Sequence, residues 1–118
     1  MNQAINKFRN RCYQLTIAIL NLTELFPNKK MYQSLSDQLF RSISSIGANL
    51  IEAKSSSSRK EYIKFYEIAL KSANESKYWL YIVKESKIVD DAVLDPIINE
   101  TVEIANIIGK SIITLKKK

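Results

Sequence analysis

The sequence predicts an all-α protein, an antiparallel up-down-up-down four-helix bundle, and three observations support this fold class. Glycine and proline occur only twice each in 118 residues, whereas all-β proteins need many of both in their turns. Apolar residues recur at steps of three and four over long segments, which is the period of an amphipathic helix. Short polar segments separate these stretches, and short connections make consecutive helices antiparallel. The length suits a single domain, residues 1–118, around one core.

The first predicted helix shows the clearest periodicity. Its apolar stripe consists of Ile5, Phe8, Cys12, Leu15, Ile19, Leu22 and Phe26. Pro27 ends this helix, because the residue before a proline is driven out of the α region. Since Cys12 lies on the apolar stripe and has no second cysteine to pair with, we expect a buried free thiol, which fits a reducing cytoplasm.

The second predicted helix runs from about Tyr32 to Ala53. Its apolar face consists of Leu35, Leu39, Ile43, Ile46, Leu50 and Ala53. Beside this face, Ser42, Ser45 and Asn49 form a narrow strip of small polar residues. Small side chains let two helix backbones approach closely. We therefore interpret the strip as a packing seam rather than a binding groove.

The third predicted helix runs from Arg59 to about Ser86, after a turn of four serines. Ser58 and Glu61 have the spacing of a capping box. The inward face consists of Tyr62, Phe65, Tyr66, Ala69, Ala73, Leu80 and Val83.

Three aromatic residues of this helix cannot all face the core. Tyr78, Trp79 and Tyr81 fall within four consecutive positions, and neighbours on a helix are turned by about 100°. They either lie flat on the flank of the bundle or form a subunit interface, where tyrosine and tryptophan are enriched. We favour the interface.

The fourth predicted helix begins at Asp90 or Asp91, either of which can cap it. Its apolar positions are Leu94, Ile97, Ile104, Ala105, Ile108, Ile112 and Leu115, with Thr101 among them. Pro96 either kinks the first turns or marks a restart with Asp95 as the cap. Gly109 carries a propensity cost in mid-helix, which predicts close packing at that point.

The net charge of +6 is unevenly distributed in an up-down-up-down bundle. One pole collects Lys7, Arg9, Arg11, Lys54, Arg59, Lys60, Lys64, Lys110, Lys116, Lys117 and Lys118, with Glu52 and Glu61 nearby. The other pole nearly cancels, because Lys29, Lys30, Lys84 and Lys87 meet Glu24, Asp37, Glu85, Asp90, Asp91 and Asp95. A basic pole is either a surface for nucleic-acid phosphates or a solvated end that only aids solubility.

The composition argues against catalysis and cofactors. The chain has no histidine and one cysteine, so the commonest general base and the usual zinc ligands are missing. Glu52 and Glu75 are the carboxylates to consider for a buried metal pair, but the Glu-x-x-His pairs of such bundle sites are absent. We therefore expect no catalytic residue, no metal and no cofactor. No apolar run is long enough to span a membrane and no signal peptide is evident, which predicts a soluble cytoplasmic protein.

The segment from Gln38 to Ala53 resembles the signature of the bacterial 23S ribosomal RNA intervening-sequence protein family. The residues that carry this resemblance are Arg41, Ser45, Ile46, Asn49, Glu52 and Ala53, followed by Ser58 to Ile63, Ile68 to Leu70 and Glu75 to Leu80 with its Tyr-Trp-Leu. Two positions depart from the family pattern: Gly47 stands where proline is common, and Ala53 where glycine is common. Both departures are compatible with a helical backbone.

The resemblance implies a four-helix bundle that assembles as a homopentamer. It also implies kinship to the accessory proteins of diversity-generating retroelements, basic pentamers that bind nucleic acid and a reverse transcriptase. Two functional hypotheses follow. The first is a non-enzymatic oligomer that binds RNA or DNA through its basic surface, as a scaffold for a protein such as a reverse transcriptase. The alternative is a structural or protein-interaction bundle without nucleic-acid binding.

One further group of polar residues needs an explanation. Arg41, Asn49 and Glu52 flank the apolar stripe of the second predicted helix. They predict either a buried or interfacial polar network that fixes helix packing or a ligand site. We favour the structural network.

Overall fold

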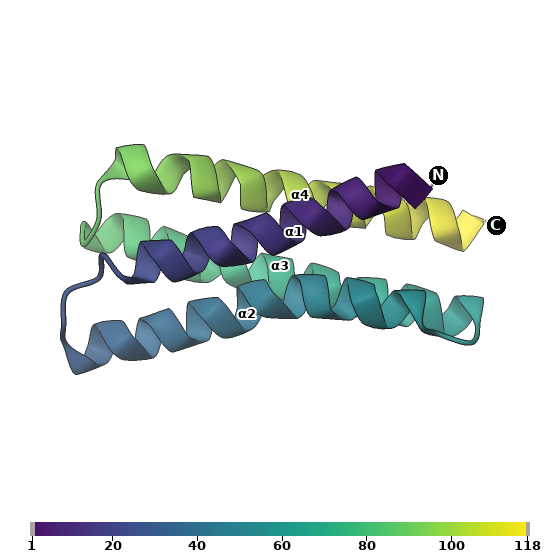
Figure 1. Cartoon of the computed structure of the whole chain (residues 1–118), viewed down its shortest axis with the longest axis horizontal. Helices are drawn as coiled ribbons and strands as arrows, with labels where there is room; N and C mark the ends of the chain where they lie inside the picture. Colours follow the sequence, from purple (N-terminus) through teal and green to yellow (C-terminus); the bar gives the residue numbers. More distant parts are fainter. Residues whose placement is uncertain (1, 118) are drawn as a thin grey trace.

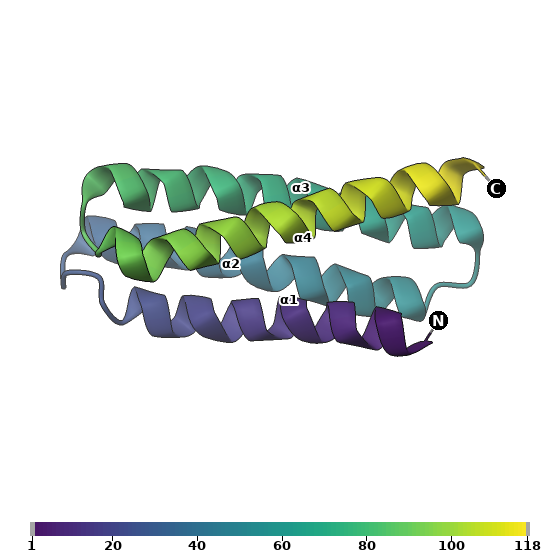
Figure 2. The ribbon, with the colours of Figure 1, turned by 90° about the horizontal axis from the view of Figure 1, so that it is seen from above.

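A computed structural model of the chain describes the backbone of residues 2–117 and the side chains of residues 6–117. Over that range the chain forms four helices: α1 (Asn2–Thr23), α2 (Lys30–Lys54), α3 (Arg59–Ser86) and α4 (Asp91–Lys117). Successive helices run in opposite directions along a bundle 47 Å long (Figures 1 and 2). The predicted all-α, antiparallel four-helix bundle is confirmed.

Each helix packs against two neighbours, so the four helices form a closed square. The pairs are α1 with α2, α2 with α3, α3 with α4, and α4 with α1. The backbones of α2 and α3 approach each other most closely. This agrees with the predicted seam, since the Ser42 hydroxyl lies 2.9 Å from that of Ser76, and the Ser45 hydroxyl 2.9 Å from that of Ser72.

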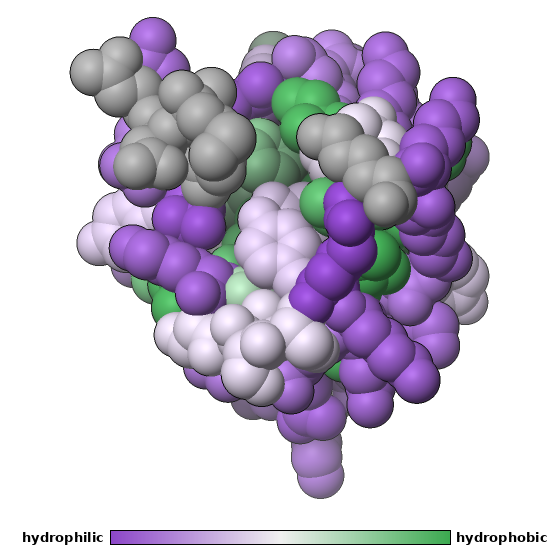
Figure 3. Space-filling model, turned by 90° about the vertical axis from the view of Figure 1, so that its right-hand side faces the viewer, coloured by the Kyte–Doolittle hydropathy of each residue, from purple (hydrophilic) through white to green (hydrophobic). Residues whose placement is uncertain are grey.

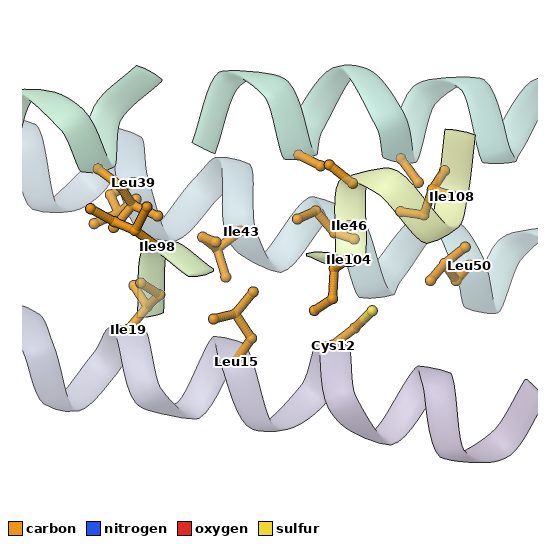
Figure 4. Packing of buried hydrophobic residues seen from close by; sticks show 14 of the residues in the cluster. Cys12, Leu15, Ile19, Leu39, Ile43, Ile46, Leu50, Ile98, Ile104 and Ile108 are labelled. Atoms are coloured by element: carbon orange, nitrogen blue, oxygen red, sulfur yellow. The ribbon is translucent and has the colours of Figure 1, made fainter. Parts of the chain in front are cut away.

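The core runs along the middle of the bundle and is almost entirely aliphatic (Figure 4). Leu15 of α1 points towards Ile43 of α2, and Ile19 points towards Ile98 of α4. Cys12 is only 1% exposed, which confirms that it is a buried small residue. Burial raises the pKa of the Cys12 thiol to about 12, because a thiolate would lose its hydration there.

The start of α3 follows the sequence prediction. The Ser58 hydroxyl accepts the backbone N–H of Glu61 at 3.1 Å, and the Glu61 carboxylate accepts the N–H of Ser57 at 3.1 Å. The first bond satisfies a donor that the first turn of a helix leaves without an intrahelical partner, and the second holds the turn just before the helix. The capping prediction is therefore confirmed, and α3 has the bounds that the sequence predicted.

Two helix ends differ from the prediction or resolve what it left open. Helix α1 ends at Thr23 rather than Phe26, because the N–H groups of Leu25 and Phe26 bond three residues back and tighten the chain into a turn. Helix α4 begins at Asp91 and continues through Pro96 without a restart. In this first part of the helix, the missing N–H of Pro96 costs one bond, to the carbonyl of Ala92, an exposed residue that water can reach.

The prediction of close packing at Gly109 is wrong. A Cβ atom built at Gly109 would meet no atom within 4 Å, whereas one at Gly47 would lie 3.7 Å from the Cβ of Cys12. Gly109 follows the fully buried Ile108 and lies at the edge of the core-facing stripe of α4, where space is open.

None of the described helices has the length and apolarity needed to cross a bilayer.

Candidate nucleic-acid interface

One end of the bundle brings together chain segments that are far apart in the sequence. The start of α1, the turn between α2 and α3, and the end of α4 all lie at this end (Figure 1). We call it the basic end. Its described cationic residues are Lys7, Arg9, Arg11, Lys54, Arg59, Lys60, Lys64, Lys110, Lys116 and Lys117, whereas Lys118 lies outside the described residues. The predicted convergence of these segments follows from the antiparallel fold.

Six lysines of the basic end have no acidic partner among the described residues. They are Lys7, Lys54, Lys60, Lys64, Lys110 and Lys117. All six are exposed, and among the described residues no carboxylate lies within ion-pair distance of their ammonium groups. They come from all four helices. The surplus positive charge of this end is therefore accessible to a ligand from solvent.

Arg11 is different, because its charge is already neutralised. Its Nε and Nη2 atoms donate to the two oxygens of Glu100 at 3.0 and 2.7 Å, and Nη2 lies 3.1 Å from Glu103. The hydrogen bond to Glu100 raises the pKa of the guanidinium above its ordinary value. This bidentate pair ties α1 to α4. Arg11 therefore brings less free positive charge to the basic end than the sequence predicted, because the sequence does not reveal that α4 places two glutamates beside it. Its contact with phosphate stays a prediction.

Two other cationic residues of the basic end also have local interactions. The Nζ of Lys116 donates to Glu67 at 2.9 Å. Arg9 is half-buried and makes one long hydrogen bond of 3.4 Å to Asn6, and its buried Nε has no partner among the described residues. Lys116 is tied across the α3–α4 contact, whereas Arg9 makes no ion pair with a described carboxylate.

A pair of tyrosines lies near the same end, at the start of α3. The rings of Tyr62 and Tyr66 stack with centroids 5.0 Å apart, and their hydroxyls lie 3.3 Å from each other. Burial raises the pKa of Tyr66, so its hydroxyl stays protonated. Figure 3 looks onto this end and shows hydrophilic side chains around a paler and more hydrophobic centre. Periodicity alone assigned both tyrosines to the core, and their spacing of four was the only signal for the pair.

At the opposite end, two of the four lysines that the sequence assigned to it form ion pairs, and acidic residues outnumber the lysines there. The Nζ of Lys84 lies 2.6 Å from Asp95, and that of Lys87 lies 3.9 Å from Asp91. The pair with Asp95 raises the pKa of Lys84. Positive charge is therefore polarised towards the basic end.

A small pocket also lies beneath the α1–α2 loop, away from the basic end. Its volume is about 260 Å³. The lining residues are Thr23, Phe26, Pro27, Asn28, Tyr32, Gln33, Ser36 and Asp37. It contains no cationic side chain, so it does not suit a phosphate.

The predicted network of Arg41, Asn49 and Glu52 is not buried in the single chain. Arg41 and Glu52 are exposed, and the Asn49 amide bonds to the backbone oxygen and hydroxyl of Ser45 at 2.8 and 3.0 Å. The residues flank the apolar stripe instead of lying within it, which leaves the two charged heads in solvent. The buried form of this prediction was wrong, and an interfacial role remains a prediction.

The aromatic residues of α3 divide into two groups. Tyr78 and Tyr81 are 61% and 48% exposed. Trp79 is half-buried against the core, and its Nε1 donates to Glu75 at 2.9 Å. The ring of Tyr78 meets that of Trp79 edge to face at 5.1 Å. The two tyrosines are therefore the side chains available to a partner.

Comparison with known proteins places this fold in a family. No curated protein sequence matches the chain. A crystal structure of a protein of unknown function from the S23 ribosomal protein family of Bacteroides thetaiotaomicron is similar, with 31% identity and a TM-score of 0.82, over 89% of this chain and 97% of the other. The model of the 23S rRNA-intervening sequence protein family matches residues 6–110. Sequence and fold agree over nearly the whole chain, which therefore belongs to the 23S rRNA-intervening sequence protein family.

Proposed function

We propose that the protein is a non-enzymatic, oligomeric bundle that binds nucleic acid, RNA or DNA, through its basic end. The observation that supports this most strongly is the set of six exposed lysines without acidic partners, contributed by all four helices. Each phosphate that a lysine neutralises releases condensed counterions, which favours association.

The chemistry of this surface favours binding that tolerates sequence variation. Lysine heads are flexible point charges that contact phosphates, and phosphate contacts carry no base identity. The described residues also carry no recognised base-reading motif, such as a zinc finger or the aromatic sheet surface of an RNA-binding domain. The nucleic acid would therefore be selected by its charge and shape.

Self-association is the second part of the proposal. The family resemblance implies a homopentamer, and the exposed Tyr78 and Tyr81 supply aromatic contact area of the kind enriched in interfaces. In such an assembly each subunit contributes one basic end, so weak contacts add as avidity. A cytoplasmic scaffold of this kind could hold a nucleic acid beside a protein partner such as a reverse transcriptase, as the resemblance implies.

The test is a salt series of binding to structured RNA, single strands and duplex DNA. Replacing Lys60 and Lys64 by Gln removes two cationic contacts from the basic end, so the slope of log affinity against log salt should fall by about two. The fold should persist, because both side chains are exposed. The matched control replaces Lys29 and Lys30, two exposed lysines at the opposite end, and should leave the slope unchanged. Equal effects of the two pairs, or no binding by the wild type at low salt, would contradict the proposal.

The alternative is an interaction bundle whose charge only keeps it in solution. The observation in its favour is that several large apolar side chains are exposed away from the basic end, among them Tyr13 and Tyr78. Under this alternative the wild type assembles but binds no nucleic acid at any salt concentration.

A further inference from the structure

An uncharged apolar strip runs along the outer side of the α1–α2 contact. On α1, Tyr13, Ile17 and Leu20 are 62%, 37% and 44% exposed. Their spacing of four and three places them on one stripe of the helix. On α2, Phe40 and Ile51 are 38% and 58% exposed.

The two stripes lie next to each other. On α1, Arg11 reaches α4, and Cys12, turned by about 100°, meets Gly47 of α2. Another step of the same size brings Tyr13 to the outer surface on the α2 side. On α2, Phe40, Ser44, Gly47 and Ile51 follow steps of four, three and four, so their stripe borders α1 where Gly47 meets Cys12.

The strip is large enough to be an interface. With about 200 Å² for the surface of a large side chain, the exposed fractions of these five residues leave on the order of 500 Å² uncovered. The largest apolar patch of a typical monomer is ~300–600 Å², and a standard protein interface covers ~800 Å² per partner. The strip alone supplies more than half of that area.

The chemistry of the strip selects a protein partner over nucleic acid. None of its residues is charged at neutral pH, although a quarter of the chain is charged. Phosphates would find no counter-charge there. Between Phe40 and Ile51 the stripe of α2 carries only the small residues Ser44 and Gly47, so no long polar side chain separates its two apolar ends.

The same chain exposes large aromatic side chains on another of its faces, and these are able to cover the strip. Tyr78 and Tyr81 project from α3, whose backbone borders α2 and α4 but not α1 over the described residues. Asn74 lies on the same outer stripe of α3, one turn before Tyr78 and two turns before Tyr81, and it is also exposed. Because the serine pairs fix the register of α2 against α3, Asn74 and Ser44 lie at nearly the same height along the bundle, and so do Tyr78 and Phe40.

We propose that the strip of Tyr13, Ile17, Leu20, Phe40 and Ile51 docks onto the Tyr78–Tyr81 face of α3 in a second copy of this chain. Two different faces meet in this contact, so it is heterologous and can repeat around a ring with all basic ends on one side. The inference rests on the self-association within the proposed function and is independent of nucleic-acid binding.

Light scattering without nucleic acid provides the first test. Ile17→Glu places a charge in the strip, and the concentration for half-assembly should rise at least tenfold while the helical circular dichroism is unchanged. The control is Met31→Glu, which alters a 69% exposed residue off the strip and should keep the wild-type mass. A wild-type mass for Ile17→Glu would overturn the docking surface alone. A monomeric wild type would overturn both this surface and the proposed self-association.

Disulfide crosslinking tests the pairing of the faces. The native Cys12 is buried, so new surface cysteines react selectively. The double variant Ser44→Cys with Asn74→Cys should oxidise to a ladder of covalent multimers, and a mixture of the two single variants should stop at dimers. Each single variant alone should stay uncrosslinked. Self-crosslinking of Ser44→Cys alone would show a two-fold contact, and no ladder in an assembled double variant would exclude this pairing; either result overturns the proposal.

Discussion

At the scale of single residues, sequence periodicity predicted burial well and ion pairing poorly. Cys12 lies where its stripe predicted, because burial follows from the helix repeat alone. The partners of Arg11 could not be predicted, since the pair with Glu100 depends on how α1 sits beside α4. The same reason explains Gly109, whose neighbours depend on the rotation of α4.

The Cys12 thiol should give a distinctive alkaline dependence of stability. Its pKa is raised by burial from about 9 to about 12, so the folded chain holds this proton more tightly than the unfolded chain. The resulting stability is complete below pH 9 and is lost as the pH rises from 9 towards 12. Urea unfolding of the wild type and Cys12→Ala measures this, because alanine does not titrate. The stability advantage of the wild type should be constant from pH 7 to 9 and shrink above pH 9; an advantage that stays constant to pH 11 would contradict it.

At the scale of helices, the elements were predictable where a local signal marks them. The bounds of α3 followed from Ser58 and Glu61, whose capping bonds form within four residues. The end of α1 was misplaced because Phe26 keeps the apolar period and packs on the core after the helix has ended. Apolar spacing indicates which residues contact the core. A residue in a turn can make that contact as well as a residue in a helix, so the spacing does not show where the helix ends.

The seam between α2 and α3 gives a prediction at this scale. Ser76 is fully buried and its hydroxyl lies 2.8 Å from the backbone oxygen of Ser72. Ser76→Ala should cost only about 1 kcal/mol, because Ser42 keeps its own bond to Leu39 at 3.1 Å. Ser76→Leu should cost about 1–3 kcal/mol more, since the added volume forces two closely packed backbones apart.

Thermal and urea unfolding compare these variants. Ser34→Leu makes the same substitution at an exposed site of α2 and is the control, with an expected change within about 0.5 kcal/mol. Equal stabilities for Ser76→Leu and Ser76→Ala would mean that the seam has room for a large side chain.

At the scale of the whole molecule, topology was the most predictable feature and partner surfaces the least. Short loops fixed the up-down order, and that order fixed which lysines share an end. The apolar strip went unnoticed in the sequence, because Phe40 and Ile51 of α2 gain meaning only when α1 brings Tyr13 beside them. When two helices share a surface, each contributes only a few of its residues, so neither helix shows a sequence periodicity that reveals the surface.

Assembly and nucleic-acid binding should therefore be coupled through geometry. Each bundle is 24 by 20 Å across, so a duplex of one turn, ~34 Å long, covers little more than one basic end, whereas three turns reach several subunits of a ring.

The variant Ile17→Glu keeps the six exposed lysines of the basic end but loses the neighbouring subunits of the ring. Its affinity for the three-turn duplex should fall by about 10² or more through lost avidity, and its affinity for the one-turn duplex should match that of the wild type. Fluorescence anisotropy at fixed salt measures both. Equal losses on the two lengths would show that Ile17 affects the basic end itself, and no loss on either would show that single subunits bind independently.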